Sequence, residues 1–129
     1  TPNGLVAPAI FNVDKKSIPK ISDEIEKLVE DANRGELAIA KLVGGTFTIT
    51  NLGAFGIEAF IPLVNPPQTA IVGVGKTFVK PVVVSDKIVV KPLVTMSLVF
   101  DHRVVDGAPA AAFLQEVKRF LEDPHLLEE

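Results

Sequence analysis

The chain has 129 residues, of which 47% are hydrophobic and 22% charged, and its formal net charge at pH 7 is −3. This balance is typical of a folded domain with a modest core and argues against disorder. The negative net charge argues against a nucleic-acid surface, because such surfaces need clustered Lys and Arg. With no cysteine and two histidines, the chain has no disulfide, no thiolate ligand and no typical metal site. No apolar stretch approaches the length of a membrane span.

The first part of the chain predicts one helix preceded by an extended segment. Gly4–Val13 is short, apolar and interrupted by Pro8, which favours an edge strand or an extended segment leading into the fold. Ser17–Arg34 has apolar residues at helical spacing, with Pro19 in the first turn and Gly35 as the stop. We interpret it as a surface helix packed on a sheet, without a chemical role.

The middle of the chain predicts strands joined by turns. Thr46–Thr50 (TFTIT) alternates as a strand does. Asn51–Pro67 is a long apolar loop rich in Gly and Pro, and such loops pack against a ligand channel or a neighbouring subunit. Ala70–Val84 predicts one or two strands, Ser85-Asp86 a turn, and Lys87–Phe100 the returning strands.

The last part predicts a buried strand followed by a helix. Leu93–Phe100 (LVTMSLVF) is apolar and rich in strand-forming residues. The helix spans about Asp106–Glu122, with Asp106 at the N-cap, and His125–Glu129 is a short tail. The element order predicts an α/β fold, an α+β two-layer sandwich with a mixed, largely antiparallel sheet and helices on one face.

The stretch Phe100–Gly107 (FDHRVVDG) places His102 at the corner between this strand and this helix. A histidine at such a corner can be held rigidly and still face a cleft, as a general base does. The spacing alone supports equally well a helix-capping loop in which the histidine only makes hydrogen bonds to nearby backbone.

Three motifs together carry a family resemblance: Thr46–Gly53 (TFTITNLG), Pro62–Gly75 (PLVNPPQTAIVGVG) and Phe100–Gly107. In order and spacing they resemble the catalytic domain of dihydrolipoamide acyltransferases, the core subunits of 2-oxo-acid dehydrogenase complexes, and this family is related to chloramphenicol acetyltransferase. The resemblance covers essentially the whole chain, but the family's domain is much longer. It implies that residues 1–129 are the C-terminal part of an acyltransferase catalytic domain with a chloramphenicol acetyltransferase-like fold.

The resemblance also implies a reaction, the transfer of an acyl group from S-acyl-dihydrolipoamide to coenzyme A. His102 is then the general base on the coenzyme A thiol, and Thr50 donates a hydrogen bond to the oxyanion. Asp106 is counted with the catalytic residues and fixes the loop through polar contacts. Asn51 and Gly75 are expected to contact coenzyme A. The chemistry needs no metal and no covalent acyl-enzyme.

Asp101 and Arg103 flank His102, and we interpret both as structural residues. The resemblance implies a homotrimer whose active sites lie between subunits, with His102 from one subunit and the Thr50 turn from its neighbour. Such trimers assemble into cores of 24 or 60 subunits.

The expected partners are the N-terminal half of the same catalytic domain, a lipoyl group carried on a separate domain, the decarboxylase and the dihydrolipoamide dehydrogenase. The expected location is the cytoplasm of a bacterium or archaeon, or the mitochondrial matrix. Two alternatives remain: a non-catalytic scaffold fragment of the same core, and a stand-alone chloramphenicol-type acetyltransferase. The acyl group is left open among acetyl, branched-chain and succinyl.

Overall fold

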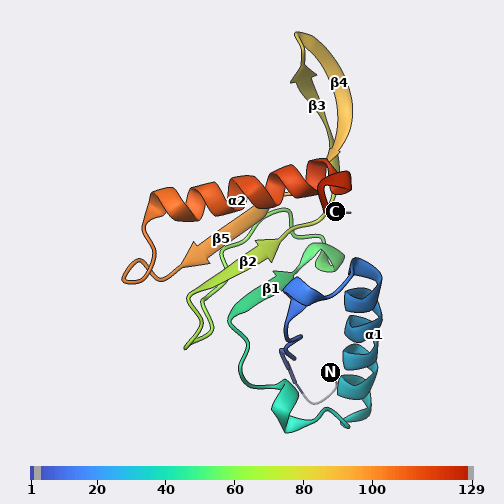
Figure 1. The fold of residues 1–129 in the computed structure, drawn as a ribbon. Helices are drawn as coiled ribbons and strands as arrows, with labels where there is room; N and C mark the ends of the chain where they lie inside the picture. The colour runs from blue at the N-terminus through green and yellow to red at the C-terminus, as the bar shows by residue number, and fades with distance from the viewer. Residues whose placement is uncertain (2–3, 128–129) are drawn as a thin grey trace. The chain divides into compact units, whose positions relative to one another are not determined.

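The structure is a computed structural model that describes residues 1 and 4–127 (Figure 1). The chain divides into two compact units, Thr1–Thr46 and Phe47–Glu129. The helices and strands are α1 (Ile18–Arg34), β1 (Phe47–Asn51), β2 (Ala70–Val74), β3 (Phe78–Val84), β4 (Lys87–Leu93), β5 (Met96–Phe100) and α2 (Gly107–Glu122), with short 3-10 turns between them. Among the described residues, no helix is both long and apolar enough to cross a membrane.

The first unit contains the predicted amphipathic helix, α1. Ser17 precedes it with extended backbone, and Pro19 lies in its first turn. Gly35 ends it with a φ of 74°, a left-handed conformation that glycine adopts without steric cost, and its N–H donates to the Ala32 carbonyl at 3.1 Å. Leu28 is the one side chain of α1 that is buried.

The segment before α1 has no regular strand within residues 4–12. The Ala9 N–H donates to the Lys41 carbonyl at 2.7 Å, which ties this segment to the chain after α1. The edge-strand alternative is therefore wrong, because a strand needs a continuous ladder of such bonds. Pro8, which has no N–H, is consistent with this outcome.

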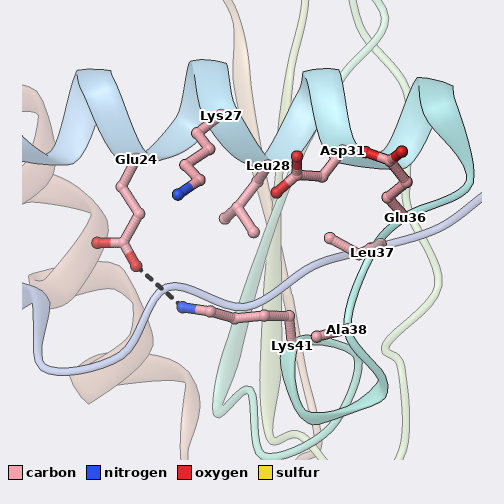
Figure 2. A pocket seen from close by; sticks show the side chains of 8 residues that line it. All are labelled: Glu24, Lys27, Leu28, Asp31, Glu36, Leu37, Ala38 and Lys41. Atoms are coloured by element: carbon pink, nitrogen blue, oxygen red, sulfur yellow. Dashed lines mark hydrogen bonds and ion pairs between the residues drawn. The ribbon is translucent and has the colours of Figure 1, made fainter.

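A hollow beside α1 lies wholly within the first unit. Its lining residues, shown in Figure 2, are Glu24, Lys27, Leu28, Asp31, Glu36, Leu37, Ala38 and Lys41. The Glu24 carboxylate accepts a hydrogen bond from Lys41 Nζ at 3.1 Å and pairs with Lys16 as well. These two bonds lower the pKa of Glu24 below its ordinary value. They connect the helix to the segments before and after it.

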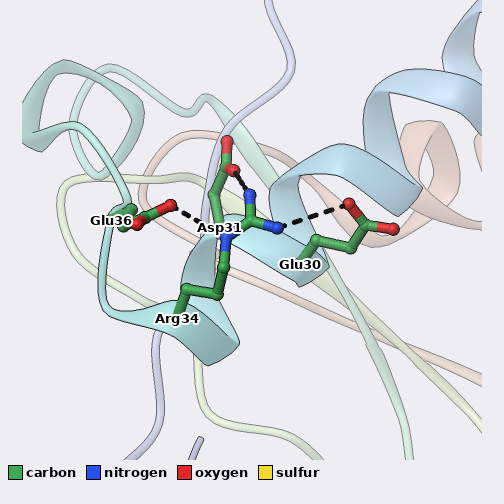
Figure 3. Close-up of polar contacts among 4 residues, drawn as sticks. All are labelled: Glu30, Asp31, Arg34 and Glu36. Atoms are coloured by element: carbon green, nitrogen blue, oxygen red, sulfur yellow. Dashed lines mark hydrogen bonds and ion pairs between the residues drawn. The ribbon is translucent and has the colours of Figure 1, made fainter.

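Arg34 gathers three carboxylates at the end of α1 (Figure 3). Its guanidinium lies 2.6 Å from Asp31, 2.8 Å from Glu36 and 3.8 Å from Glu30. A cation in the last turn interacts favourably with the helix dipole, so this cluster stabilises the end of the helix and the turn after it.

The second unit contains a mixed three-stranded sheet in the order β1-β2-β5. β1 is parallel to β2, with Thr50 opposite Gly73, and β2 is antiparallel to β5, with Ala70 opposite Phe100. β3 and β4 form a separate antiparallel hairpin. The predicted mixed α/β architecture is confirmed, and its strands are divided between two small sheets.

The apolar run Leu93–Phe100 was expected to form one buried strand, and this expectation is wrong. Leu93 ends β4 in the hairpin, whereas Met96 begins β5 in the three-stranded sheet. The residues of β5 are only partly buried. Two consecutive strands give the same apolar pattern as one long strand, and no Gly or Pro marks the break.

Both faces of the three-stranded sheet are partly covered by the same unit. On one face, the Phe47 ring packs against the Phe113 ring of α2, with centroids 5.6 Å apart. On the other face, a Cβ added at Gly73 would lie 2.9 Å from the Phe60 ring and 3.2 Å from Pro62. The long loop after β1 therefore packs on the sheet of its own chain.

The chain has little core of its own and much exposed apolar surface. Among the described residues, the buried apolar side chains are Leu28, Pro62, Ile71, Val72 and Ala110. The most exposed large apolar side chains, each at least 70% exposed, are Leu5, Ile39, Ile49, Phe55, Ile61, Leu63, Val83, Ile88 and Val90. Exposed apolar surface of this extent is typical of a chain that binds further protein.

Candidate active site

His102 lies on the turn between β5 and α2, as the sequence predicts. Phe100 ends the strand, and the extended backbone of Asp106 begins the helix, where the Ala110 N–H donates to the Asp106 carbonyl at 3.2 Å. The His102 ring lies 5.7 Å from the Phe100 ring, centroid to centroid. The side chain of His102 is 72% exposed, so its imidazole can reach a molecule outside this chain.

Asp106 lies near His102 but is not hydrogen-bonded to it. The distance from His102 Nδ1 to Asp106 Oδ1 is 3.7 Å, which exceeds hydrogen-bond length, and the Asp106 side chain is 84% exposed. The Asp106 side chain also makes no capping hydrogen bond to α2, so its N-cap role rests on its backbone. In this chain Asp106 therefore does not orient the imidazole directly.

Asp101 and Arg103, the two neighbours of His102 in the sequence, are hydrogen-bonded to each other. The Asp101 carboxylate accepts hydrogen bonds from the Arg103 N–H at 2.9 Å, from Nε at 2.9 Å and from Nη2 at 2.6 Å. The Arg103 guanidinium and N–H lower the pKa of Asp101 to about 2. These contacts agree with the structural interpretation of Asp101 and Arg103, because they close a turn that has His102 at its centre.

Thr50 and Asn51 end β1, where the turn after the strand is held by its own side chain. The Gly53 N–H donates to Asn51 Oδ1 at 2.7 Å, and the Leu52 N–H donates to the Val74 carbonyl at 3.1 Å. Thr50 is half-buried and lies opposite Gly73. Because the side-chain oxygen of Asn51 accepts the bond from Gly53, the side-chain NH₂ group of Asn51 is the part that could donate to a ligand.

Gly75 is required by the packing of its own chain. A Cβ at this position would lie 1.9 Å from the Glu58 carbonyl oxygen and 2.6 Å from its carbon. The Gly75 N–H donates to the Thr95 carbonyl at 2.9 Å, and the Lys76 N–H to the Ile57 carbonyl at 2.7 Å. The close approach that this glycine permits is thus to backbone, and its contact with coenzyme A stays a prediction.

Glu58 is a residue near this turn that the sequence patterns did not single out. Its carboxylate lies 3.8 Å from both Lys76 Nζ and Lys80 Nζ, which come from the far side of β2 in the sequence. A lone glutamate in an irregular loop carries no periodic or motif signal. Glu58 and its two lysine contacts become apparent only in the structure, where the loop lies beside the residues that follow β2.

The structure brings Thr50, Asn51 and Gly75 to one end of the sheet and places His102 at the other. Thr50 is level with Gly73, whereas Phe100, two residues before His102, is level with Ala70. At about 3.3 Å per residue and 4.8 Å between strands, the Cα atoms of Thr50 and Phe100 are about 14 Å apart. A single chain therefore does not bring the His102 imidazole and the Thr50 hydroxyl together.

Comparison with known proteins identifies the family of this chain. Residues 1–128 match the family of 2-oxoacid dehydrogenases acyltransferase (catalytic domain). The chain belongs to this family.

Curated relatives of this acyltransferase-family chain come from bacteria and mitochondria. It is 46% identical to the dihydrolipoyllysine-residue acetyltransferase component of the acetoin cleaving system of Bacillus subtilis, over 97% of this chain and 31% of the relative. It is 45% identical to the mitochondrial succinyltransferase component of the 2-oxoglutarate dehydrogenase complex of Mus musculus, over 98% of this chain and 28% of the relative. The chain thus spans about a third or less of these proteins.

Solved structures share its fold. The dihydrolipoamide acetyltransferase of Azotobacter vinelandii, studied for the catalytic roles of a serine, a histidine and an asparagine, superimposes with a TM-score of 0.94 at 38% identity. A structure of the cubic core of the pyruvate dehydrogenase multienzyme complex gives the same values. Each comparison covers 99% of this chain and 53% of the solved chain, so the chain spans about half of those structures.

Proposed function

We propose that this chain is the C-terminal part of the catalytic domain of a dihydrolipoyl acyltransferase, which moves an acyl group from S-acyl-dihydrolipoamide to coenzyme A. The observation that carries the proposal is the exposed His102 imidazole on a turn fixed between β5 and α2, in a chain of this family. A 2-oxo-acid dehydrogenase complex supplies the acyl-dihydrolipoamide. The product is the coenzyme A thioester.

The chemistry needs a base, because a thiol with a pKa of about 8.5 is mostly protonated at neutral pH. The His102 imidazole takes the proton from the coenzyme A thiol, and the sulfur attacks the thioester carbonyl. The carbon–sulfur bond to dihydrolipoamide then breaks, and the proton passes from the imidazolium to the departing sulfur. No oxidant, metal or covalent enzyme intermediate is needed.

Thr50 supports this mechanism as a donor to the oxyanion that forms during the attack. A single well-placed donor contributes about 3 kcal/mol to the transition state. The serine, histidine and asparagine examined in the Azotobacter protein have the same separations along their chain as Thr50, His102 and Asp106 have here. This correspondence supports Thr50 as the hydroxyl donor and favours Asp106 as the counterpart of the asparagine.

The separation of His102 from Thr50 favours an active site built by two copies. The two groups lie at opposite ends of the sheet, and the His102 turn is exposed. A cyclic trimer joins one end of a subunit to the other end of its neighbour, which would bring His102 of one copy to Thr50 of the next. Assembly of such trimers into a core of 24 or 60 subunits belongs to the same proposal.

The first experiment measures acyl transfer to coenzyme A by the protein expressed from its complete gene. We expect His102→Ala to abolish transfer with the particle intact, and Thr50→Ala to lower kcat about 100-fold with little change in KM. Thr50→Ser, which keeps the hydroxyl, is the matched control and should keep most of the activity. Full activity of His102→Ala would remove this histidine from the mechanism, and a wild type that neither binds coenzyme A nor transfers an acyl group would favour the scaffold alternative.

The second experiment tests the shared site by mixing the inactive His102→Ala variant with the strongly impaired Thr50→Ala variant. Co-assembly of His102→Ala and Thr50→Ala subunits at equal amounts should regain about one quarter of wild-type activity, because one site in four then combines an intact His102 with an intact Thr50. If each site were built by one chain, mixing would restore nothing. Separate assembly followed by mixing without exchange is the control.

The acyl group and the partners belong to the proposal as well. The acetyltransferase and the succinyltransferase relatives are similar to this chain at nearly equal identity, so transfer assays should compare acetyl, branched-chain and succinyl donors. The proposed partners are the remaining half of the catalytic domain, a lipoyl group on a separate domain, the decarboxylase and the dihydrolipoamide dehydrogenase. A bacterial or archaeal cytoplasm or the mitochondrial matrix is the proposed location.

A further inference from the structure

The turn that carries His102 is closed twice by Asp101. The Asp101 carboxylate accepts from the Arg103 N–H at 2.9 Å, which closes a ring around His102 through the side chain. The Asp101 main-chain carbonyl accepts from the Val104 N–H at 3.0 Å and the Val105 N–H at 3.1 Å, which closes a second ring through the backbone. His102 is the first residue inside both rings, so its φ and ψ depend on Asp101.

Both ends of this turn are attached to regular structure. The Asp101 N–H donates to the Thr69 carbonyl at 2.8 Å, directly before β2, and the Asp106 carbonyl accepts from the Ala110 N–H of α2. The turn therefore has little freedom to move as a whole. The direction in which the His102 side chain leaves the backbone depends on the φ and ψ of His102. The two rings set these angles.

The carboxylate itself is held in place by the Arg103 guanidinium. Nε lies 2.9 Å from Oδ1 and Nη2 lies 2.6 Å from Oδ2, a two-pronged contact. The Arg103 side chain is 90% exposed and that of Asp101 is 24% exposed. Because such exposed ion pairs contribute little to folding free energy, the role that this pair supports is geometric.

We propose that Asp101 is a positioning residue for His102, which sets the direction of the imidazole by closing the turn on both sides of it. The inference rests on the proposed function, in which His102 is the general base. It assigns to Asp101 the orienting role that a carboxylate bonded to the imidazole would otherwise have, since Asp106 lies 3.7 Å from the ring. The Asp101 carboxylate is engaged by Arg103 and not by the imidazole, so in this proposal Asp101 acts on His102 only through the turn.

The test compares three variants at Asp101 in the protein expressed from its complete gene. Asp101→Ala removes the acceptor of the Arg103 N–H, and we expect kcat to fall 10- to 100-fold with the KM for coenzyme A within twofold, because a displacement of about 1 Å costs this much. Asp101→Asn and Asp101→Ser each keep an acceptor for that N–H, and both should keep at least half of the wild-type kcat. Rescue by these two variants separates a turn-closing role from a requirement for the charge.

The matched control is Glu116→Ala on α2. It removes a second exposed carboxylate–arginine contact among the described residues of this unit, Glu116 with Arg119 at 2.8 Å, which is 14 residues from His102 in the sequence. We expect no change in kcat from this substitution. The thermal midpoint and the particle mass of every variant show whether a lost activity reflects lost assembly.

The outcomes separate failure of the inference from failure of the proposed function. If His102→Ala is inactive and Asp101→Ala has wild-type kcat, Asp101 does not position the base, while the function stands. If His102→Ala is active, the proposed function fails first. Should Asp101→Ala not assemble, a tenfold or larger loss of kcat in assembled Asp101→Asn and Asp101→Ser would overturn the inference, and retained kcat in both would support it.

Discussion

The close approach of Gly75 to the loop at Glu58 predicts a large loss of stability for Gly75→Ala. The added Cβ would lie 1.9 Å from the Glu58 carbonyl oxygen and 3.2 Å from the Ile57 carbonyl oxygen. Both obstacles are backbone, so the loop or the end of β2 has to move. Overpacking of this kind costs about 1–3 kcal/mol, and the hydrogen bond from the Lys76 N–H to the Ile57 carbonyl, itself worth about 1 kcal/mol, would weaken as well.

The expected loss is therefore about 2–4 kcal/mol of unfolding free energy. For a domain of this size, about 4 °C of Tm corresponds to 1 kcal/mol, so differential scanning calorimetry should show a Tm lower by about 8–16 °C. Gly107→Ala is the matched control, because an added Cβ there meets nothing within 4 Å. A Tm for Gly75→Ala within about 2 °C of the wild type would refute the packing explanation, and glycine at this position would then need another reason, such as the predicted contact with coenzyme A.

Two further predictions follow from the charges and turns of the second unit. Because the pKa of Asp101 is lowered from 3.8 to about 2, the stability that its contacts contribute is complete above pH 3.8 and is lost only as the pH falls through about 2. The pH–rate profile of Asp101→Asn should therefore have the same shape as that of the wild type between about pH 5.5 and 8.5, and a new acidic limb in either would contradict this. Ser85 and Asp86 form the β3–β4 turn with positive φ values of 49° and 61°, which Asn-Gly adopts more easily. Replacing them by Asn-Gly should stabilise the hairpin by about 1 kcal/mol in urea unfolding, and a loss of stability would show that the turn is not of this type.

The local elements were predictable because their signals lie within a few residues. The helix over Ser17–Arg34 is confirmed, with Pro19 at its start and Gly35 at its end. The second helix and the Ser85-Asp86 turn are confirmed for the same reason, since caps and turns depend on the conformation of single residues. The family was also predictable, because three motifs keep their order and spacing.

The failures concern interactions between distant segments. The run Leu93–Phe100 contains residues of two strands that pair with different partners, and its apolar pattern does not reveal the partner. Gly4–Val13 has an apolar composition that suits a strand, but it finds a single described hydrogen bond to another segment, at Ala9. Strand assignment depends on a neighbour, which composition alone does not supply.

The sequence by itself determined the two helices, the turns, the family and the identity of His102 and Thr50 as candidates for chemistry. Only the tertiary structure decided that these two residues lie at opposite ends of one sheet, that Asp101 closes the turn around His102, and that Gly75 faces the Glu58 backbone. The physical reason is the separation in sequence between the residues that interact. Caps, turns and helical periodicity arise from interactions within a few residues, whereas strand pairing and close packing depend on which distant segments exclude water together.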